Sequence, residues 1–471
     1  MRALLVGRGI VVGDGCYLER SEQPVREFEE WLRAQTTRLT IGSQWRADRF
    51  LHRANDLEPQ MQKKSDEALR QALVASVQPM RRRGFCDELT TEAFAAIREA
   101  ACRTLGKRHY DVQLLAGRAL LRGEIAEMAT GEGKTLAGTL AVCTAAASGV
   151  AVHVVTVNDY LAERDAEENR PLYEYFGLGV GVVKQEMSPE SRRAQYEKPI
   201  VYVSNKELTF DYLKDRIALG GALTTHVKLR RLNRSRDGAT PILRGLHMAV
   251  VDEADSVLID EARTPLIISE TLPDELGEAT YAHAIAIAEQ LKKDEDYRVT
   301  KDRDAWLTTA GERRVRTLTV ELGGVWKSAL WRKELLQQAL SALYLFQRDR
   351  HYIVVDGKVQ IVDEFTGRVM ADRTWERGLH QMIEAKEKCE ISGQRRTLSQ
   401  ITYQRFFGRY LLLAGMTGTA KEVEPEIKRV YDLSALKIPT HKPSMRVRLP
   451  DRVFATADER WQEVVRRARA V

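Results

Sequence analysis

Cysteine is scarce in this sequence, and the five that occur lie far apart along the chain. None of them forms a C-x-x-C pair, so the sequence suggests neither a zinc knuckle nor a disulfide framework. Small secreted domains commonly depend on such frameworks, whereas chains in a reducing compartment do not. The cysteine usage therefore favours the cytosol.

A strong excess of charge of one sign is also missing. Lysine and arginine number 73 against 67 aspartates and glutamates, which gives a formal net charge of +6 over 471 residues. A charge this small does not by itself indicate binding to nucleic acid. Charged residues make up 30% and hydrophobic residues 44% of the chain, a balance that excludes a wholly disordered protein.

The sequence also lacks a convincing membrane-spanning run. Residues 135–157 carry no formal charge, but small and hydroxyl side chains dilute their hydrophobicity, and Ser148 and Gly149 divide them into a helix-length and a strand-length piece. The apolar start of the chain is interrupted by Arg8 and is followed by no small-residue cleavage site. It therefore does not predict a signal peptide.

The chain is long enough for about three domains at roughly 150 residues each. Apolar residues recur at helical spacing from about residue 26, which predicts a helical N-terminal region over residues 1–105. Short strand-like runs then alternate with helical stretches, at residues 123–128, 151–157, 200–204 and 247–252. The alternation predicts an α/β fold over residues 106–269, with a parallel sheet and helices on both faces. Ligands of such sheets bind beyond the carboxyl ends of the strands.

This alternation stops near residue 270, where polar sequence with weak periodicity begins. We expect an inserted α+β domain over residues 270–360. Residues 361–436 should return to the first domain, with helical sequence through Leu413 and a Gly/Thr loop at 415–420. Residues 437–471 contain a strand-like run and a helical start, which predicts the beginning of a further domain.

The strongest motif lies between a predicted strand and a predicted helix. It reads Met128-Ala129-Thr130-Gly131-Glu132-Gly133-Lys134-Thr135. In a phosphate-binding loop the glycines let backbone N–H groups turn towards phosphate oxygens, and the helix N-terminus adds favourable partial charge. Lys134 would reach the β- and γ-phosphates, and the Thr135 hydroxyl would coordinate magnesium. Met128 stands where the usual pattern has its first glycine. The alternative, an ordinary glycine-rich turn with a solvated lysine, is disfavoured by the flanking strand and helix.

A second motif is an apolar strand that ends in acids, Val250-Val251-Asp252-Glu253-Ala254-Asp255. Asp252 would hold magnesium through water, and Glu253 would orient and deprotonate the attacking water. This makes Glu253 and Lys134 the predicted catalytic residues. Acids after an apolar run more often cap a helix, but the order of the two motifs, on separate predicted strands of one sheet, favours an ATP site.

Three further segments have no chemistry that can be read from their residue types. They are Tyr110–Gln113, Thr156–Asp165 and Gly415–Ala420. Together with Asp260–Ile268 and Ile361–Arg368, they resemble the SecA family, the ATP-driven motor of the bacterial Sec preprotein translocase, from about Leu57 to the end of the chain.

The resemblance implies a P-loop NTPase domain of the RecA-like fold, with ATP and Mg²⁺ as cofactors. Gln113 matches the glutamine that reads adenine in the family, and Tyr110 stands where a phenylalanine is usual. The family also has methionine at the Met128 position. The insert would be the preprotein cross-linking domain, which clamps an unfolded secretory chain. Implied partners are unfolded preproteins and the Sec translocon channel, at the cytoplasmic face of the inner membrane, with peripheral attachment and no nucleic acid.

Two departures from the family qualify this expectation. Residues 226–244 form an apparent basic insertion, which is either a solvated loop or a contact with anionic phospholipid headgroups. The family hydrolyses ATP between two motor domains, and no motif of the second is found before Val471. We therefore expect weak ATP binding and slow hydrolysis, unless a second motor domain is supplied elsewhere.

Two other functions remain as alternatives. The literal Asp-Glu-Ala-Asp at residues 252–255 also occurs in nucleic-acid helicases, but residues 156–165 lack a basic strand-gripping pattern and the insert lacks aromatic residues interleaved with basic ones. The other alternative is a nucleotide- or preprotein-binding module without activity of its own.

Overall fold

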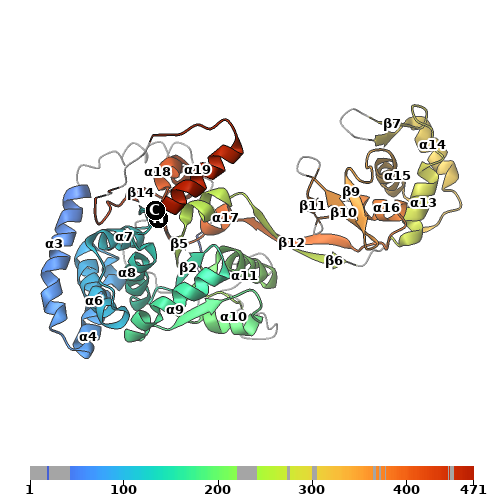
Figure 1. Cartoon of the computed structure of the whole chain (residues 1–471). Coiled ribbons are helices and arrows are strands. Elements are labelled where there is room, and N and C mark those ends of the chain that lie inside the picture. Colours follow the sequence, from blue (N-terminus) through green and yellow to red (C-terminus); the bar gives the residue numbers. More distant parts are fainter. Residues whose placement is uncertain are drawn as a thin grey trace, which may run out of the picture. The chain divides into compact units, whose positions relative to one another are not determined.

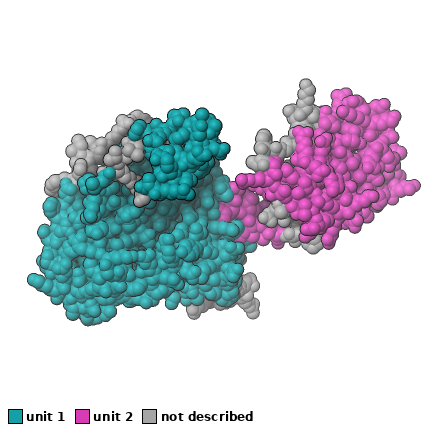
Figure 2. All heavy atoms as spheres, in the orientation of Figure 1, with its two compact units in different colours: residues 1–264, 402–471 teal, residues 265–401 magenta. Residues whose placement is uncertain are grey.

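The computed structural model describes residues 18–20, 43–219, 241–272, 276–299, 305–363, 367–370, 373–376, 378–443, 445 and 450–470 (Figure 1). Most of the basic stretch 226–244 and part of the segment 361–368 lie outside these residues. The chain divides into two compact units, which are coloured separately in Figure 2. Unit 1 comprises residues 1–264 and 402–471, and unit 2 comprises residues 265–401.

Unit 1 is built on a seven-stranded sheet with the order β14-β1-β13-β5-β2-β4-β3. All neighbouring strands in it are parallel. The strands are β1 (Ile125–Glu127), β2 (Val152–Thr156), β3 (Val180–Val183), β4 (Ile200–Ser204), β5 (Met248–Asp252), β13 (Leu412–Thr417) and β14 (Ala435–Lys437). The predicted RecA-like α/β fold with a parallel sheet is confirmed.

The central strands are buried on both faces. Alternate residues such as Val152, Val154 and Val250 belong to one large apolar cluster. Residues between them, such as Val155 and Val251, are also fully buried. Strands with no solvent face read as continuous apolar runs, which is why the sequence identified them.

This sheet is contacted by the helices α7 (Asp111–Leu121), α8 (Lys134–Ala147), α9 (Asp159–Tyr175), α10 (Pro189–Tyr196), α11 (Asn205–Ala218) and α18 (Ala420–Tyr431). The short helices η2 (Ser256–Asp260) and α17 (Tyr403–Phe407) pack on each other and on α18. The helix α19 (Ala457–Ala470) has no buried residue. In the described part of the chain, none of the helices combines the length and the apolar character needed to span a bilayer.

The expected helical N-terminal region is present in the described residues. It consists of α3 (Ser43–Gln62), α4 (Asp66–Val77), α5 (Met80–Arg83) and α6 (Asp87–Leu105). The α6 helix begins after Cys86 and ends at Gly106, whose positive φ of 65° suits a helix C-cap. Its alanine-rich face contacts α8 and α9, so this region shares the core of unit 1.

Unit 2 has a separate core made from three helices and short strands. The helices α13 (Glu278–Ala288), α15 (Ala329–Tyr344) and α16 (Leu379–Lys386) pack on one another. The other elements are β6 (Pro265–Leu272), β7 (Tyr297–Val299), β8 (Ala305–Leu307), α14 (Thr309–Leu318), η3 (Gly324–Lys327), β9 (Tyr352–Val355), β10 (Lys358–Val362), β11 (Val369–Met370) and β12 (Gln394–Thr402). The unit is therefore α+β, with small antiparallel sheets.

Unit 2 extends well past residue 360, where we expected the insert to end. The β10 strand pairs with β9 and β11 inside unit 2, and Met382 and Ile383 of α16 lie in its core. The expected helical sequence through Leu413 is also interrupted, because residues 394–402 form β12, which pairs with β6. The apolar runs that form β9 and β10 have strand length, but such a run does not reveal which sheet it will join.

Candidate nucleotide site

The predicted phosphate loop connects β1 to α8. Met128 is buried, and its N–H donates to the Thr417 carbonyl at the end of β13 with an N···O distance of 2.9 Å. Gly131 and Gly133 have positive φ values of 91° and 78°, a backbone conformation that favours glycine. No side chain caps the N-terminus of α8. The first N–H groups of this helix can therefore be satisfied by an anion, as a phosphate requires.

The acidic strand places its carboxylates beside this loop. The Lys134 Nζ lies 3.0 Å from both carboxylate oxygens of Glu253. Glu253 has a φ of 50°, so a residue other than glycine adopts the left-handed backbone conformation at this point. The two predicted catalytic residues are thus brought together from elements far apart in the sequence.

Asp252 lies at the end of β5 and is mostly buried. Burial, together with the neighbouring charge of Glu253, raises the pKa of Asp252 to about 6. A buried carboxylate of this kind is stabilised by a cation. Asp252 and the Thr135 hydroxyl, with phosphate oxygens, are the donor types that Mg²⁺ prefers, so the residues present fit a magnesium–nucleotide complex.

The Gly/Thr segment 415–420, whose role the sequence did not reveal, joins the two motifs. A Cβ on Gly415 would lie 2.8 Å from the Ala254 Cβ, so only glycine lets β13 lie this close to the acidic segment. The Thr419 hydroxyl donates to the Asp255 carboxylate. Although burial acts to raise it, hydrogen bonds from Thr419 and Thr417 hold the pKa of Asp255 below its usual value. The strand β13 and the residues after it therefore contact both the phosphate loop and the acidic segment.

The predicted base-reading residues lie at the start of α7, on the other side of the phosphate loop. The Gln113 Nε2 donates to the Glu132 carbonyl at 2.9 Å, and the Gln113 Oε1 accepts from the Tyr110 N–H at 2.9 Å. Gln113 is buried, whereas the Tyr110 side chain is half-exposed. The glutamine thus joins α7 to the phosphate loop in this structure.

The segment 156–165 mainly organises the edge of the sheet. Asn158 caps α9 by accepting from the Leu161 N–H, and the Asp159 carboxylate accepts from the Ser204 hydroxyl at 2.6 Å. Asn158 and Asp159 follow the end of β2, and Ser204 is the last residue of β4. These contacts hold α9 and β4 together at the edge of the sheet, and the residue types alone did not reveal them.

One contact of the site was not predicted. The ring of His441, beyond β14, stacks on the Tyr110 ring, and the backbone N–H of His441 donates to the Glu132 carboxylate. An exposed histidine in a proline-containing segment gives no sequence signal.

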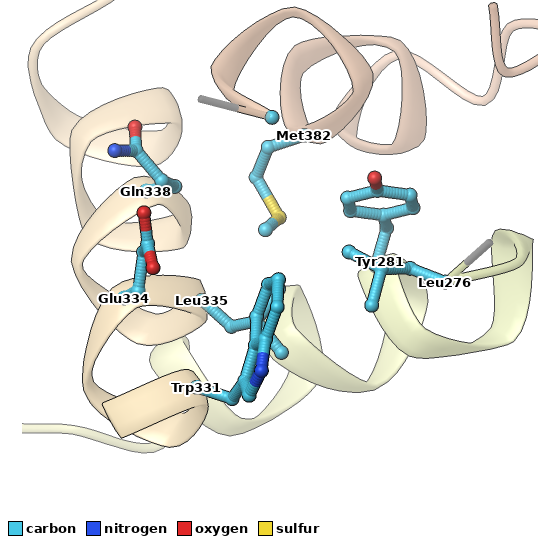
Figure 3. Close-up of a pocket in the computed structure, with 8 residues that line it drawn as sticks. Leu276, Tyr281, Trp331, Glu334, Leu335, Gln338 and Met382 are labelled. Carbon is cyan, nitrogen blue, oxygen red and sulfur yellow. The ribbon is translucent and has the colours of Figure 1, made fainter. Parts of the chain in front are cut away.

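Unit 2 contains a separate apolar cavity of about 160 Å³ between α13, α15 and α16 (Figure 3). Tyr281, Trp331 and Met382 face it from the three helices, and Glu334 and Gln338 lie along one side (Figure 3). The cavity has about the size of one large side chain. Methionine and aromatic rings make an adaptable apolar lining.

Comparison with known proteins agrees with these features. The family model of the SecA DEAD-like domain matches residues 33–428. The chain is 48% identical over 432 residues to protein translocase subunit SecA 2 of Nitrosospira multiformis, covering 90% of this chain and 64% of that protein. It is 50% identical over 393 residues to protein translocase subunit SecA 2 of Bordetella avium, covering 82% of this chain and 59% of that protein.

The chain therefore spans about three fifths of the length of these relatives. A solved structure of a hypothetical ATP-dependent RNA helicase from Sulfolobus tokodaii aligns with 35% of the chain at 21% identity, with a TM-score of 0.25, which is too low to bear on function. The helicase alternative is not favoured. From the match to most of its length, the chain belongs to the SecA family.

Proposed function

We propose that this chain is the ATP-binding motor portion of a SecA-type protein translocase. The observation that carries the proposal is the convergence of Lys134, Glu253 and Asp252 on one phosphate loop at the carboxyl edge of a parallel sheet. Membership of the SecA family supports the translocase assignment. The proposed activity is hydrolysis of ATP to ADP and phosphate, coupled to export of unfolded preproteins.

The proposed site divides the work among a few residues. The loop from Met128 to Thr135 would bind the phosphates through backbone N–H groups, and Lys134 would leave Glu253 to contact the β- and γ-phosphates. Glu253, released from Lys134, would orient the attacking water and accept its proton. Thr135 and Asp252 would hold Mg²⁺, which when bound neutralises charge on the phosphate oxygens.

The proposed partners are unfolded preproteins and the Sec translocon channel, at the cytoplasmic face of the inner membrane. We propose that the cavity of unit 2 receives an apolar side chain of the preprotein. Its adaptable lining of Trp331, Tyr281 and Met382 suits a substrate of variable sequence. We also propose that the chain contacts anionic phospholipids.

The test of the ATP site is a Lys134→Ala substitution. We expect ATP binding in the presence of Mg²⁺, measured by isothermal titration calorimetry, to weaken at least tenfold, because a charged hydrogen-bond partner of the phosphates is removed, a contribution of about 1.5–3 kcal/mol. The matched control is Lys421→Ala, at an exposed lysine near the start of α18. Unchanged ATP affinity in the Lys134→Ala protein would show that the phosphate-loop assignment is wrong.

A further inference from the structure

The segment that follows β14 carries a histidine that is fixed against the ATP site at two points. The rings of His441 and Tyr110 stack with their centroids 3.8 Å apart and their planes inclined by 22°. The backbone N–H of His441 also donates to the Glu132 Oε2 at 2.9 Å. The same residue thus contacts both the start of α7 and the phosphate loop.

The pairing of β14 with β1 explains why His441 reaches this place. The two strands are parallel, with Lys437 opposite Glu127. The Ile438 N–H continues the pairing by donating to the Glu127 carbonyl at 2.9 Å. Because parallel strands leave a sheet at the same edge, the phosphate loop after β1 and the segment after β14 emerge side by side.

The phosphate loop is contacted by residues of two different elements. Lys134 meets Glu253 of the acidic segment after β5, where the terminal phosphates belong. Gln113 of α7 contacts the Glu132 and Gly133 carbonyls and accepts from the Tyr110 N–H, so Tyr110 lies beside the same loop. A nucleotide with its γ-phosphate at Lys134 would direct its base towards Tyr110, a half-exposed aromatic side chain. Aromatic rings are common stacking surfaces for nucleic-acid bases.

We propose that His441 is a specificity-determining residue of the ATP site, beside Tyr110. To bind, an adenine ring must displace the His441 ring from the face of the Tyr110 ring. This inference rests on the proposed binding of ATP. The base, and not the phosphates, then displaces the His441 ring, because a polyphosphate has no ring to compete for the Tyr110 face. The segment after β14 is therefore sensitive to the identity of the ligand.

The first test compares affinities for MgATP, MgADP and magnesium tripolyphosphate in the full chain. Removing the competing ring with His441→Ala should tighten ATP and ADP binding about two- to tenfold, the usual range for the loss of one aromatic contact. Affinity for tripolyphosphate should not change. His441→Phe, which keeps a ring for stacking, should bind ATP like the unaltered protein, and Thr440→Ala, at an exposed neighbour, is the matched control.

The second test observes the ring itself. In protein labelled with ¹³C-histidine, the His441 ring signal, assigned from its absence in His441→Phe, should shift with ATP and stay in place with tripolyphosphate. If the unaltered protein binds no ATP, the proposed function fails. If ATP binds but the signal does not move, or if His441→Ala weakens ATP binding or leaves it unchanged, the proposal for His441 is wrong while the ATP site stands.

Discussion

Single buried side chains in the core of unit 1 have titration properties that the sequence does not show. His247, just before β5, is buried, and its Nδ1 has no hydrogen-bond partner in the described part of the chain. Burial, with a smaller effect of Arg244, lowers the pKa of His247 to about 4. An unfolded chain would protonate this histidine near its ordinary pKa of about 6.5.

The folding stability should therefore depend on pH through His247. Above about pH 6.5 the residue is neutral in both states, so it has no effect. As the pH falls from about 6.5 towards 4, only the unfolded state takes up the proton, and the folded state loses about 1.4 kcal/mol per pH unit. Replacement by leucine removes this loss.

When the pH is lowered from 7 to 4.5, we expect the unaltered protein to lose about 2 kcal/mol more free energy of unfolding than His247→Leu loses. Urea unfolding at the two pH values measures this difference. His52→Leu, at an exposed histidine of α3, is the control and should show no such change with pH. An equal pH dependence in His247→Leu and the unaltered protein would contradict the prediction.

The elements around the ATP site are joined by one buried arginine. Arg98 of α6 is only 1% exposed. It donates to the His109 carbonyl at 2.7 Å, to the Asp111 Oδ1 at 2.7 Å and to the Asn55 Oδ1 of α3 at 2.7 Å. Since Tyr110 lies between His109 and Asp111, Arg98 connects the N-terminal helices to the base end of the site.

Removing this connection should affect both stability and nucleotide binding. We expect Arg98→Met to lower the free energy of unfolding by about 3 kcal/mol, because it leaves partly buried acceptors unpaired, and to weaken ATP binding without a comparable loss for tripolyphosphate. Arg53→Met breaks an ion pair with Glu92 in which both side chains are about 40% exposed, and should cost at most about 1 kcal/mol. Urea unfolding and calorimetry measure the two effects; equal losses for the two variants would contradict this role for Arg98.

The sequence predicted the elements that carry strong patterns. The buried strands of the sheet, the loop from Met128 to Thr135 and the acids after β5 could be read because apolar runs and glycine spacing are local signals. The contact of His441 with Tyr110 could not be read. It depends on the pairing of the three-residue strand β14 with β1, and such a short strand has no periodicity of its own.

At the scale of the whole molecule, the two units should fold separately because each has its own core. The apolar cluster of unit 2 is formed within residues 276–391. The sheet of unit 1 uses only strands from its two segments. Where the chain leaves and re-enters unit 1, the Gln404 N–H donates to the Ala262 carbonyl at 3.0 Å. A short linker can therefore replace residues 265–401 without straining unit 1.

This predicts the behaviour of a chain in which a few glycine and serine residues replace residues 265–401. We expect it to unfold cooperatively. It should also bind MgATP within about threefold of the unaltered protein, because the contacts of Lys134 and Glu253 lie wholly in unit 1. Binding of a fluorescent unfolded polypeptide, reduced and carboxymethylated lactalbumin, should be lost. The isolated segment 265–401 should retain that binding, because the cavity lined by Trp331 and Tyr281 lies wholly within it. Loss of ATP binding on excision would show that unit 2 completes the nucleotide site. Retained polypeptide binding by the shortened chain would place the preprotein site on unit 1 instead.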